Sequence, residues 1–204
     1  MLSLIDLLDA QSLGLTQAAW LVQQIEQGSS WLVGAKPGGA GKTTIMGALL
    51  CMLPDAPCIR LAAPGTGWKK SKPGECIVAY EISPGHYEAY IWGRELTEFT
   101  RLGQAGCRIV SNLHADTLEQ ARAQIVGQNG AAEQALAAFD IFLPIAANRK
   151  IENIFYSDGG RWREFDGRLL SRGEQIAAFL RDCQQKGIRR IEEVRRVWLL
   201  ASLS

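Results

Sequence analysis

A glycine-rich segment followed by a lysine and two threonines stands near residue 40. Residues 36–44 read KPGGAGKTT. Backbone N–H groups in such a turn wrap around the oxygens of a triphosphate, and the following helix points its positive end at them. The lysine neutralises β- and γ-phosphate oxygens, and the next hydroxyl binds Mg²⁺. The sequence therefore predicts a site for ATP and Mg²⁺. Its nucleotide-binding residues are Lys36, Pro37, Gly38, Gly39, Ala40, Gly41, Lys42, Thr43 and Thr44.

The first position of this loop departs from the usual pattern, which begins with glycine. Lys36 stands there, and the nearest upstream glycine, Gly34, comes two residues earlier. The first glycine mainly serves the turn of the chain, so the substitution bears on the geometry of the loop. A strand-to-helix turn without a ligand is the alternative. The apolar strand before the loop and the helix after it favour nucleotide binding.

Two further polar residues follow apolar runs. Glu81 comes after the run 76–80, and His114 comes after the run 107–112. Ligands bind at the carboxyl ends of strands in open α/β sheets, so we expect both side chains near Lys42. Glu81 can polarise an attacking water or hold Mg²⁺ through a water, and His114 can sense the γ-phosphate. The predicted catalytic residues are Glu81, Lys42 and His114, and the predicted metal-binding residues are Thr43 and Glu81.

Strands that alternate with helices must position these residues. This alternation predicts an α/β fold with a mostly parallel sheet and helices on both faces. Turn residues at 157–160 predict a hairpin, with two amphipathic helices after residue 173. The predicted strands of the core are 31–33, 58–61, 76–80, 107–112 and 141–145. Its predicted helices are 42–52, 87–103, 116–126 and 131–138.

The composition is that of an ordinary globular protein. Hydrophobic residues make up 47% of the 204 residues, charged residues make up 21%, and the net charge is +1. No bulk charge therefore directs the chain to nucleic acid or to an anionic membrane. The five cysteines include no C-x-x-C pair, which favours reduced thiols over a metal site. No apolar run approaches the length of a membrane span, so we expect a cytoplasmic protein without direct membrane insertion.

In this order, the features resemble the traffic ATPases of type II and type IV secretion, type IV pilus and archaeal flagellar assembly. The matching segments are, along the chain, residues 4–21, 34–44, 77–81, 103–116, 141–159 and 187–194. They correspond in that order to the family's linker, P-loop, Walker B strand, His box, last strands and C-terminal helices. The resemblance thus covers most of the chain.

The resemblance implies a RecA-like P-loop NTPase with a C-terminal β-hairpin and a helical tail. It implies an N-terminal helical linker at 1–29, a P-loop ATPase core at 30–170 and a C-terminal helical extension at 171–204. It also implies a minimal form without the family's N-terminal domain. The implied partners are ATP, further copies of the chain in a hexamer, and a secretion or pilus-type machine that holds the chain near the inner membrane. We expect no nucleic-acid partner.

Three family features are missing. The family carries an acidic box between P-loop and Walker B, but residues 60–64 read RLAAP and the next acid is Glu75. Ser83 stands where the family has an arginine, and residues 104–107 lack the first histidine of a Gly-His pair. These departures favour nucleotide binding over turnover.

Three functions therefore compete. The first is a motor-type ATPase that hydrolyses ATP and moves a neighbour. The second is a nucleotide-dependent binding or regulatory module with little hydrolysis. The third is a P-loop kinase in which the basic loop 63–74 covers phosphates, although the sequence lacks an arginine-rich lid.

Overall fold

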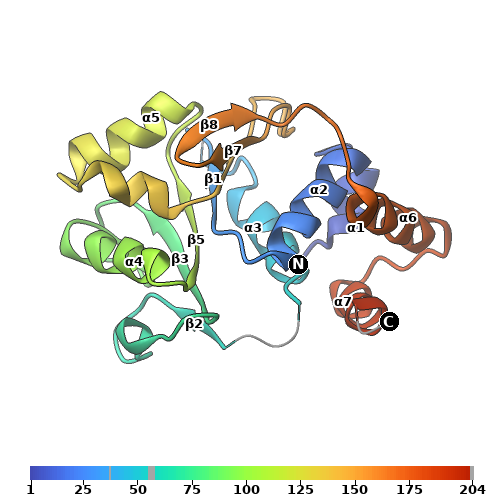
Figure 1. The fold of residues 1–204 in the computed structure, drawn as a ribbon, viewed down its shortest axis with the longest axis horizontal. Helices are drawn as coiled ribbons and strands as arrows, with labels where there is room; N and C mark the ends of the chain where they lie inside the picture. The colour runs from blue at the N-terminus through green and yellow to red at the C-terminus, as the bar shows by residue number, and fades with distance from the viewer. Residues whose placement is uncertain (37, 55–57, 203–204) are drawn as a thin grey trace.

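A central β-sheet runs through the molecule in the computed structural model, which describes residues 1–36, 38–54 and 58–202 (Figure 1). The described strands are ordered β2-β3-β5-β1-β6-β7-β8, and β4 pairs with the end of β3. Strands β1 to β6 pair in parallel, whereas β7 and β8 are antiparallel. The strands are β1 (Trp31–Gly34), β2 (Ile59–Leu61), β3 (Cys76–Ile82), β4 (Tyr90–Ile91), β5 (Arg108–Leu113), β6 (Ile141–Pro144), β7 (Phe155–Asp158) and β8 (Arg161–Glu164).

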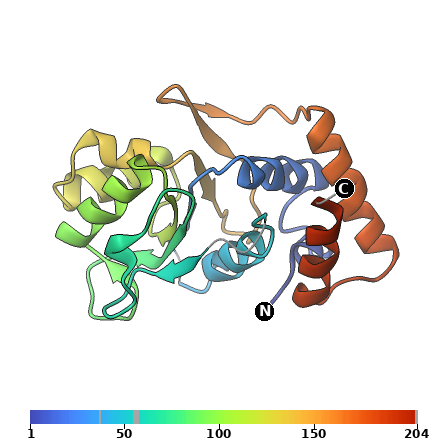
Figure 2. The ribbon, with the colours of Figure 1, turned by 60° about the horizontal axis from the view of Figure 1, so that its bottom comes forward.

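Helices cover both faces of this sheet, as Figures 1 and 2 show. One face packs against α1 (Leu4–Asp9), α2 (Leu15–Glu26), α3 (Lys42–Leu50), α6 (Ser171–Gln185) and α7 (Ile191–Ser202). The other face packs against α4 (Arg94–Gln104), α5 (Leu118–Arg122), a π-helical turn η2 (Ala123–Gln128) and two 3₁₀ turns, η1 (Trp68–Lys70) and η3 (Glu133–Ala138). Every residue of the central strands β1 and β5 is buried, as expected for parallel strands covered on both sides. The predicted fold class is confirmed.

The helices from the two ends of the chain pack against each other. Arg172 of α6 forms an ion pair with Glu26 of α2. Trp20 of α2 also stacks on Phe165, which follows β8, with ring centroids 4.8 Å apart. Both ends contribute to the hydrophobic core that also buries α3. The division of the chain at residues 29 and 170 stays a prediction. Within the described parts of the chain, no helix is long and apolar enough to cross a bilayer.

Three predicted elements are wrong in their detail. The expected helix 87–103 begins as strand β4, because left-handed backbone at Ala89 (φ 56°) and Gly93 (φ 57°) cannot continue in a helix. The expected helix 116–126 is α5 followed by the π-turn, and 131–138 is largely a 3₁₀ turn. The hairpin predicted from the turn residues 157–160 is confirmed, with β7 and β8 paired across the turn Gly159-Gly160.

Candidate nucleotide-binding site

The glycine-rich loop, residues 36–44, connects the carboxyl end of β1 to the first turn of α3. Gly39 (φ 74°) and Gly41 (φ 101°) have left-handed backbone, and Gly41 is the N-cap residue of α3. A Cβ atom built on either glycine meets nothing within 4 Å, so these glycines serve backbone conformation and leave open space above them. The predicted residue Pro37 lies outside the described residues. An exposed helix N-terminus with this open turn can accept an anion.

The peptide group of Lys36 is held by the residues that follow β5. Its N–H donates to Asp116 Oδ1 at 2.8 Å, and its carbonyl oxygen lies 3.3 Å from His114 Nδ1. Lys36 is not among the described non-glycine residues with positive φ, so a lysine fits without backbone strain. Gly34 is required for another reason, because a Cβ there would collide with the carbonyl oxygen of Ala115. The missing first glycine is therefore compatible with the loop.

Lys42 opens α3 and points its ammonium group into the site. Its side chain is only 9% exposed. Nζ donates to the carbonyl oxygen of Ala35 at 3.2 Å and lies 3.4 Å from Oε2 of Glu81. A buried ammonium group needs such partners because leaving it unpaired is costly. The lysine is thus held at the base of the loop.

Glu81 connects Lys42 to His114. Its other oxygen, Oε1, lies 2.8 Å from Nε2 of His114, and its side chain is 11% exposed. The glutamate sits at a β-bulge in β3, since Tyr80 and Glu81 together lie opposite Asn112 alone. Bulges beside active sites commonly redirect a side chain. A carboxylate between an ammonium and an imidazole can accept a proton or contact a cation.

One cavity of about 430 Å³ brings together the predicted residues that the structure describes, except Lys36. Its lining comprises Gly38, Gly39, Ala40, Gly41, Lys42, Thr43, Thr44, Glu81, Tyr90 and His114. This volume is in the range of small-molecule sites. Tyr90 enters it because β4 pairs Tyr90 with Glu81. Burial raises the pKa of Tyr90, with a further contribution from Glu81, so its hydroxyl stays protonated and can donate a hydrogen bond.

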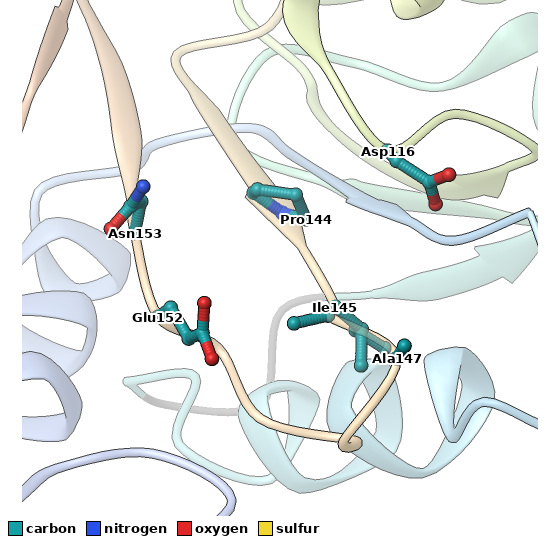
Figure 3. Close-up of a pocket in the computed structure, with 7 residues that line it drawn as sticks. Asp116, Pro144, Ile145, Ala147, Glu152 and Asn153 are labelled. Atoms are coloured by element: carbon teal, nitrogen blue, oxygen red, sulfur yellow. The ribbon is translucent and has the colours of Figure 1, made fainter.

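Two smaller cavities differ in their relation to the loop. A cavity of about 260 Å³ shares Gly39, Gly41 and Thr44 with the first and is otherwise lined mainly by Leu2, Leu7, Ser12, Ile45 and Arg149. The other, of about 320 Å³, lies beyond β6 (Figure 3). Figure 3 shows Asp116 on one side of Pro144 and Ile145, with Glu152 and Asn153 on the other side. Its two carboxylates disfavour an anion, so the Lys42 cavity is the better site for phosphate.

Sequence reasoning missed several contributors to this site. Tyr90 lay within an expected helix, and the contact of Asp116 with the loop had no signal beyond its position two residues after His114. Gln124, which lay within the expected helix 116–126, is the third, and its side chain contacts the backbone of Ile82 and His114. All five cysteines are free thiols, and the described residues contain no group of three or more His, Cys, Asp or Glu that could hold a metal ion. The roles predicted for Thr43, Glu81 and His114 stay predictions.

The sheet order, the loop after β1 and the helical layers on both sides give this chain a RecA-like α/β fold. Among the solved structures similar to this chain is the VirB11 ATPase of the Brucella suis type IV secretion system, in complex with sulphate. The identity is 17% and the TM-score is 0.52, over 74% of this chain and 54% of that chain. This chain therefore spans about half the length of that ATPase. No protein-family model and no curated protein matches the sequence.

Proposed function

We propose that this chain binds ATP and hydrolyses it with Mg²⁺, as a motor-type ATPase resembling those of secretion and pilus assembly. The observation that carries the proposal is the chain of contacts from Lys42 through Glu81 to His114 in the cavity at the start of α3. Perturbed or tightly paired ionisable groups in a cleft are a common mark of function. The RecA-like fold supports the same proposal.

The loop has the features that a triphosphate requires. Gly39 and Gly41 leave room above their backbone, and the N-terminus of α3 adds a positive dipole. Lys42 lines the cavity, and its ammonium group would neutralise phosphate oxygens. The hydroxyl of Thr43, which is exposed at the start of α3, and the carboxylate of Glu81 would hold Mg²⁺. When bound, this ion neutralises charge on the phosphates.

Glu81 is the proposed base for the reaction. Hydrolysis joins a water oxygen to the terminal phosphorus, breaks the bond from that phosphorus to the bridging oxygen, and releases a proton from the water. Phosphate binding draws the ammonium of Lys42 away from Oε2, and this oxygen then accepts the proton. His114 donates to Oε1 and contacts the carbonyl oxygen of Lys36, so it links the base to the loop.

The nucleoside is proposed to occupy the cavity of Leu2, Leu7, Ile45 and Arg149. That cavity shares Thr44 with the phosphate cavity and lies away from Glu81, at the end where the α-phosphate would sit. Its leucine and isoleucine side chains suit the faces of a base, and the Arg149 guanidinium can stack on an aromatic ring. The terminal phosphate then faces Glu81, Tyr90 and His114.

ATPase and binding assays on matched variants test the proposal. Lys42→Ala should abolish binding of a fluorescent ATP analogue and turnover, whereas Glu81→Gln should keep binding and lose turnover. The controls Lys186→Ala and Glu174→Gln remove the same charges at exposed positions and should leave both unchanged. Turnover by Glu81→Gln at the wild-type rate would overturn the assignment of Glu81.

A nucleotide-dependent binding module is the second candidate, and one observation favours it. Glu75, the first acid after residues 60–64, lies directly before β3, at the end of the strand away from Glu81, and pairs with Arg60 at 3.3 Å. It therefore does not replace the family's acidic box near the cavity. This candidate predicts tight ATP binding without turnover at any protein concentration. Sustained hydrolysis that Lys42→Ala abolishes would exclude it.

Assembly with further copies of the chain, and with a secretion or pilus-type machine at the inner membrane, is proposed on the family resemblance. Turnover per subunit that rises with protein concentration would support shared sites between copies. Mass measured by light scattering, with and without ATP, tests a hexamer directly. A monomer at every concentration would contradict the ring.

A further inference from the structure

The bulge in β3 leaves backbone groups that the strand ladder does not pair in the usual way. Ala79 pairs with Ser111 and Ile82 with Leu113, so one residue of β3 is in excess. Two amide side chains form hydrogen bonds with the backbone at this irregular end of β3. Asn112 Nδ2 donates to the carbonyl oxygen of Tyr80 at 2.9 Å, and Gln124 Nε2 donates to the carbonyl oxygen of Ile82 at 2.5 Å.

Gln124 also binds the other strand that carries a site residue. Its Oε1 accepts the backbone N–H of His114 at 3.1 Å. One side chain therefore joins the backbone directly after Glu81 to the backbone of His114. Gln124 is 6% exposed, so water does not readily replace these two bonds. The carboxylate of Glu81 and the imidazole of His114, 2.8 Å apart, are thus both carried by backbone that the Gln124 side chain holds. We call this side chain with its two hydrogen bonds the clamp.

The π-turn is what places Gln124 at this point. Residues 123–128 form one π-helical segment after α5, and such segments often occur at functional sites. Asn129, directly after the turn, donates to the carbonyl oxygen of Gln124 at 3.0 Å and accepts the N–H of Gly93 at 2.6 Å. The clamp is therefore anchored on the start of α4.

We propose that Gln124 is a positioning residue that holds Glu81 and His114 in register for ATP hydrolysis. The inference rests on the proposed function and adds to it a residue outside the cavity lining. Gln124 acts through the backbone at Ile82 and His114, without touching the phosphates. A shift of about 1 Å in a reacting group can lower turnover by about 10²-fold.

Steady-state kinetics on Gln124→Met and the matched control Gln128→Met test this. Gln128 is exposed in the same π-turn. Gln124→Met should lower kcat by about 10²-fold with little change in ATP affinity, whereas Gln128→Met should match the wild type. Gln124→Glu keeps the length of the side chain and the acceptor for His114 but loses the donor to Ile82, so it should fall between the two. Adding Gln124→Met to Glu81→Gln should cause no further loss, because both remove the same function.

A second measurement does not depend on turnover. His114 and His86 are the only histidines, so long-range ¹H–¹⁵N spectra resolve the ring nitrogens of His114 at one fixed pH without Mg²⁺. Gln124→Met should move the Nε2 signal in the same direction as Glu81→Gln does, and Gln128→Met should not move it. Unchanged His114 signals together with wild-type kcat in folded Gln124→Met would overturn the proposal. An inactive wild type with the expected His114 shifts would instead refute the ATPase assignment and retain the clamp.

Discussion

The buried pair of Lys42 and Glu81 makes a quantitative prediction about the ligand-free protein. Nζ and Oε2 are 3.4 Å apart, and the two side chains are 9% and 11% exposed. With an effective dielectric constant of about 20, Coulomb's law gives about 5 kcal/mol for unit charges at that distance. Desolvation of both groups offsets much of this attraction, so the intact pair stabilises the fold by less.

Removing one partner of the pair leaves the desolvation cost of the other charged group uncompensated. Lys42→Met leaves a buried carboxylate that keeps its contact with His114 but loses the ammonium group, and we expect the free energy of unfolding to fall by about 3 kcal/mol. That is the low end for a broken buried pair, because the site opens on a cavity. For a chain of this size, the loss lowers Tm by about 6–12 °C. The double variant Lys42→Met/Glu81→Gln should recover about 2 kcal/mol relative to the sum of the single losses.

Urea unfolding of the wild type, Lys42→Met, Glu81→Gln and the double variant, without nucleotide, measures the coupling free energy between the two side chains. The chain supplies a matched control in Lys186 and Asp182, whose charged atoms are closer, at 2.8 Å, but whose side chains are 63% and 51% exposed. Lys186→Met and Asp182→Asn should therefore show almost no coupling, because solvent screens the pair. Equal coupling in the two cycles, or additive losses at Lys42 and Glu81, would refute the argument that burial governs this site.

Three further predictions concern single positions. Gly34→Ala should lower the free energy of unfolding by about 2 kcal/mol, because its Cβ would collide with the Ala115 carbonyl, whereas Gly127→Ala has free space and should change little; equal Tm values would contradict this. Tyr90→Phe should reduce kcat for ATP about tenfold if the phenol donates to the terminal phosphate, and unchanged kinetics would remove that role. Burial raises the pKa of the Cys76 thiol from 9.0 to about 12, so the folded state holds this proton more tightly than the unfolded chain does. Stability should therefore decline as pH rises above about 9, and Cys76→Ala should lessen that decline in urea unfolding at pH 7 and pH 10.

Much of the fold was predictable because its signals are local. Five of the six parallel strands were placed to within about two residues, since buried strands appear as short apolar runs between turn residues. Helix α3 and its start at Lys42 followed from the glycine-rich loop alone. The errors fell at 87–91, 123–128 and 131–138, where strand pairing and packing override helical periodicity. Neither β4 nor the π-turn has a repeating apolar pattern long enough to detect.

The sequence by itself determined the glycine-rich loop, because its residues are contiguous and its glycines set their own backbone conformation. It also indicated that Glu81 and His114 belong at the same edge of the sheet, because strand ends converge there. Only the tertiary structure decided that one carboxylate contacts both Lys42 and His114, and that Gln124 joins the strands that carry them. These contacts depend on a β-bulge and a π-turn, which arise when segments about 40 residues apart pack together. No pattern of neighbouring residues encodes them, because each is a compromise between backbone hydrogen bonding and the fit of distant side chains.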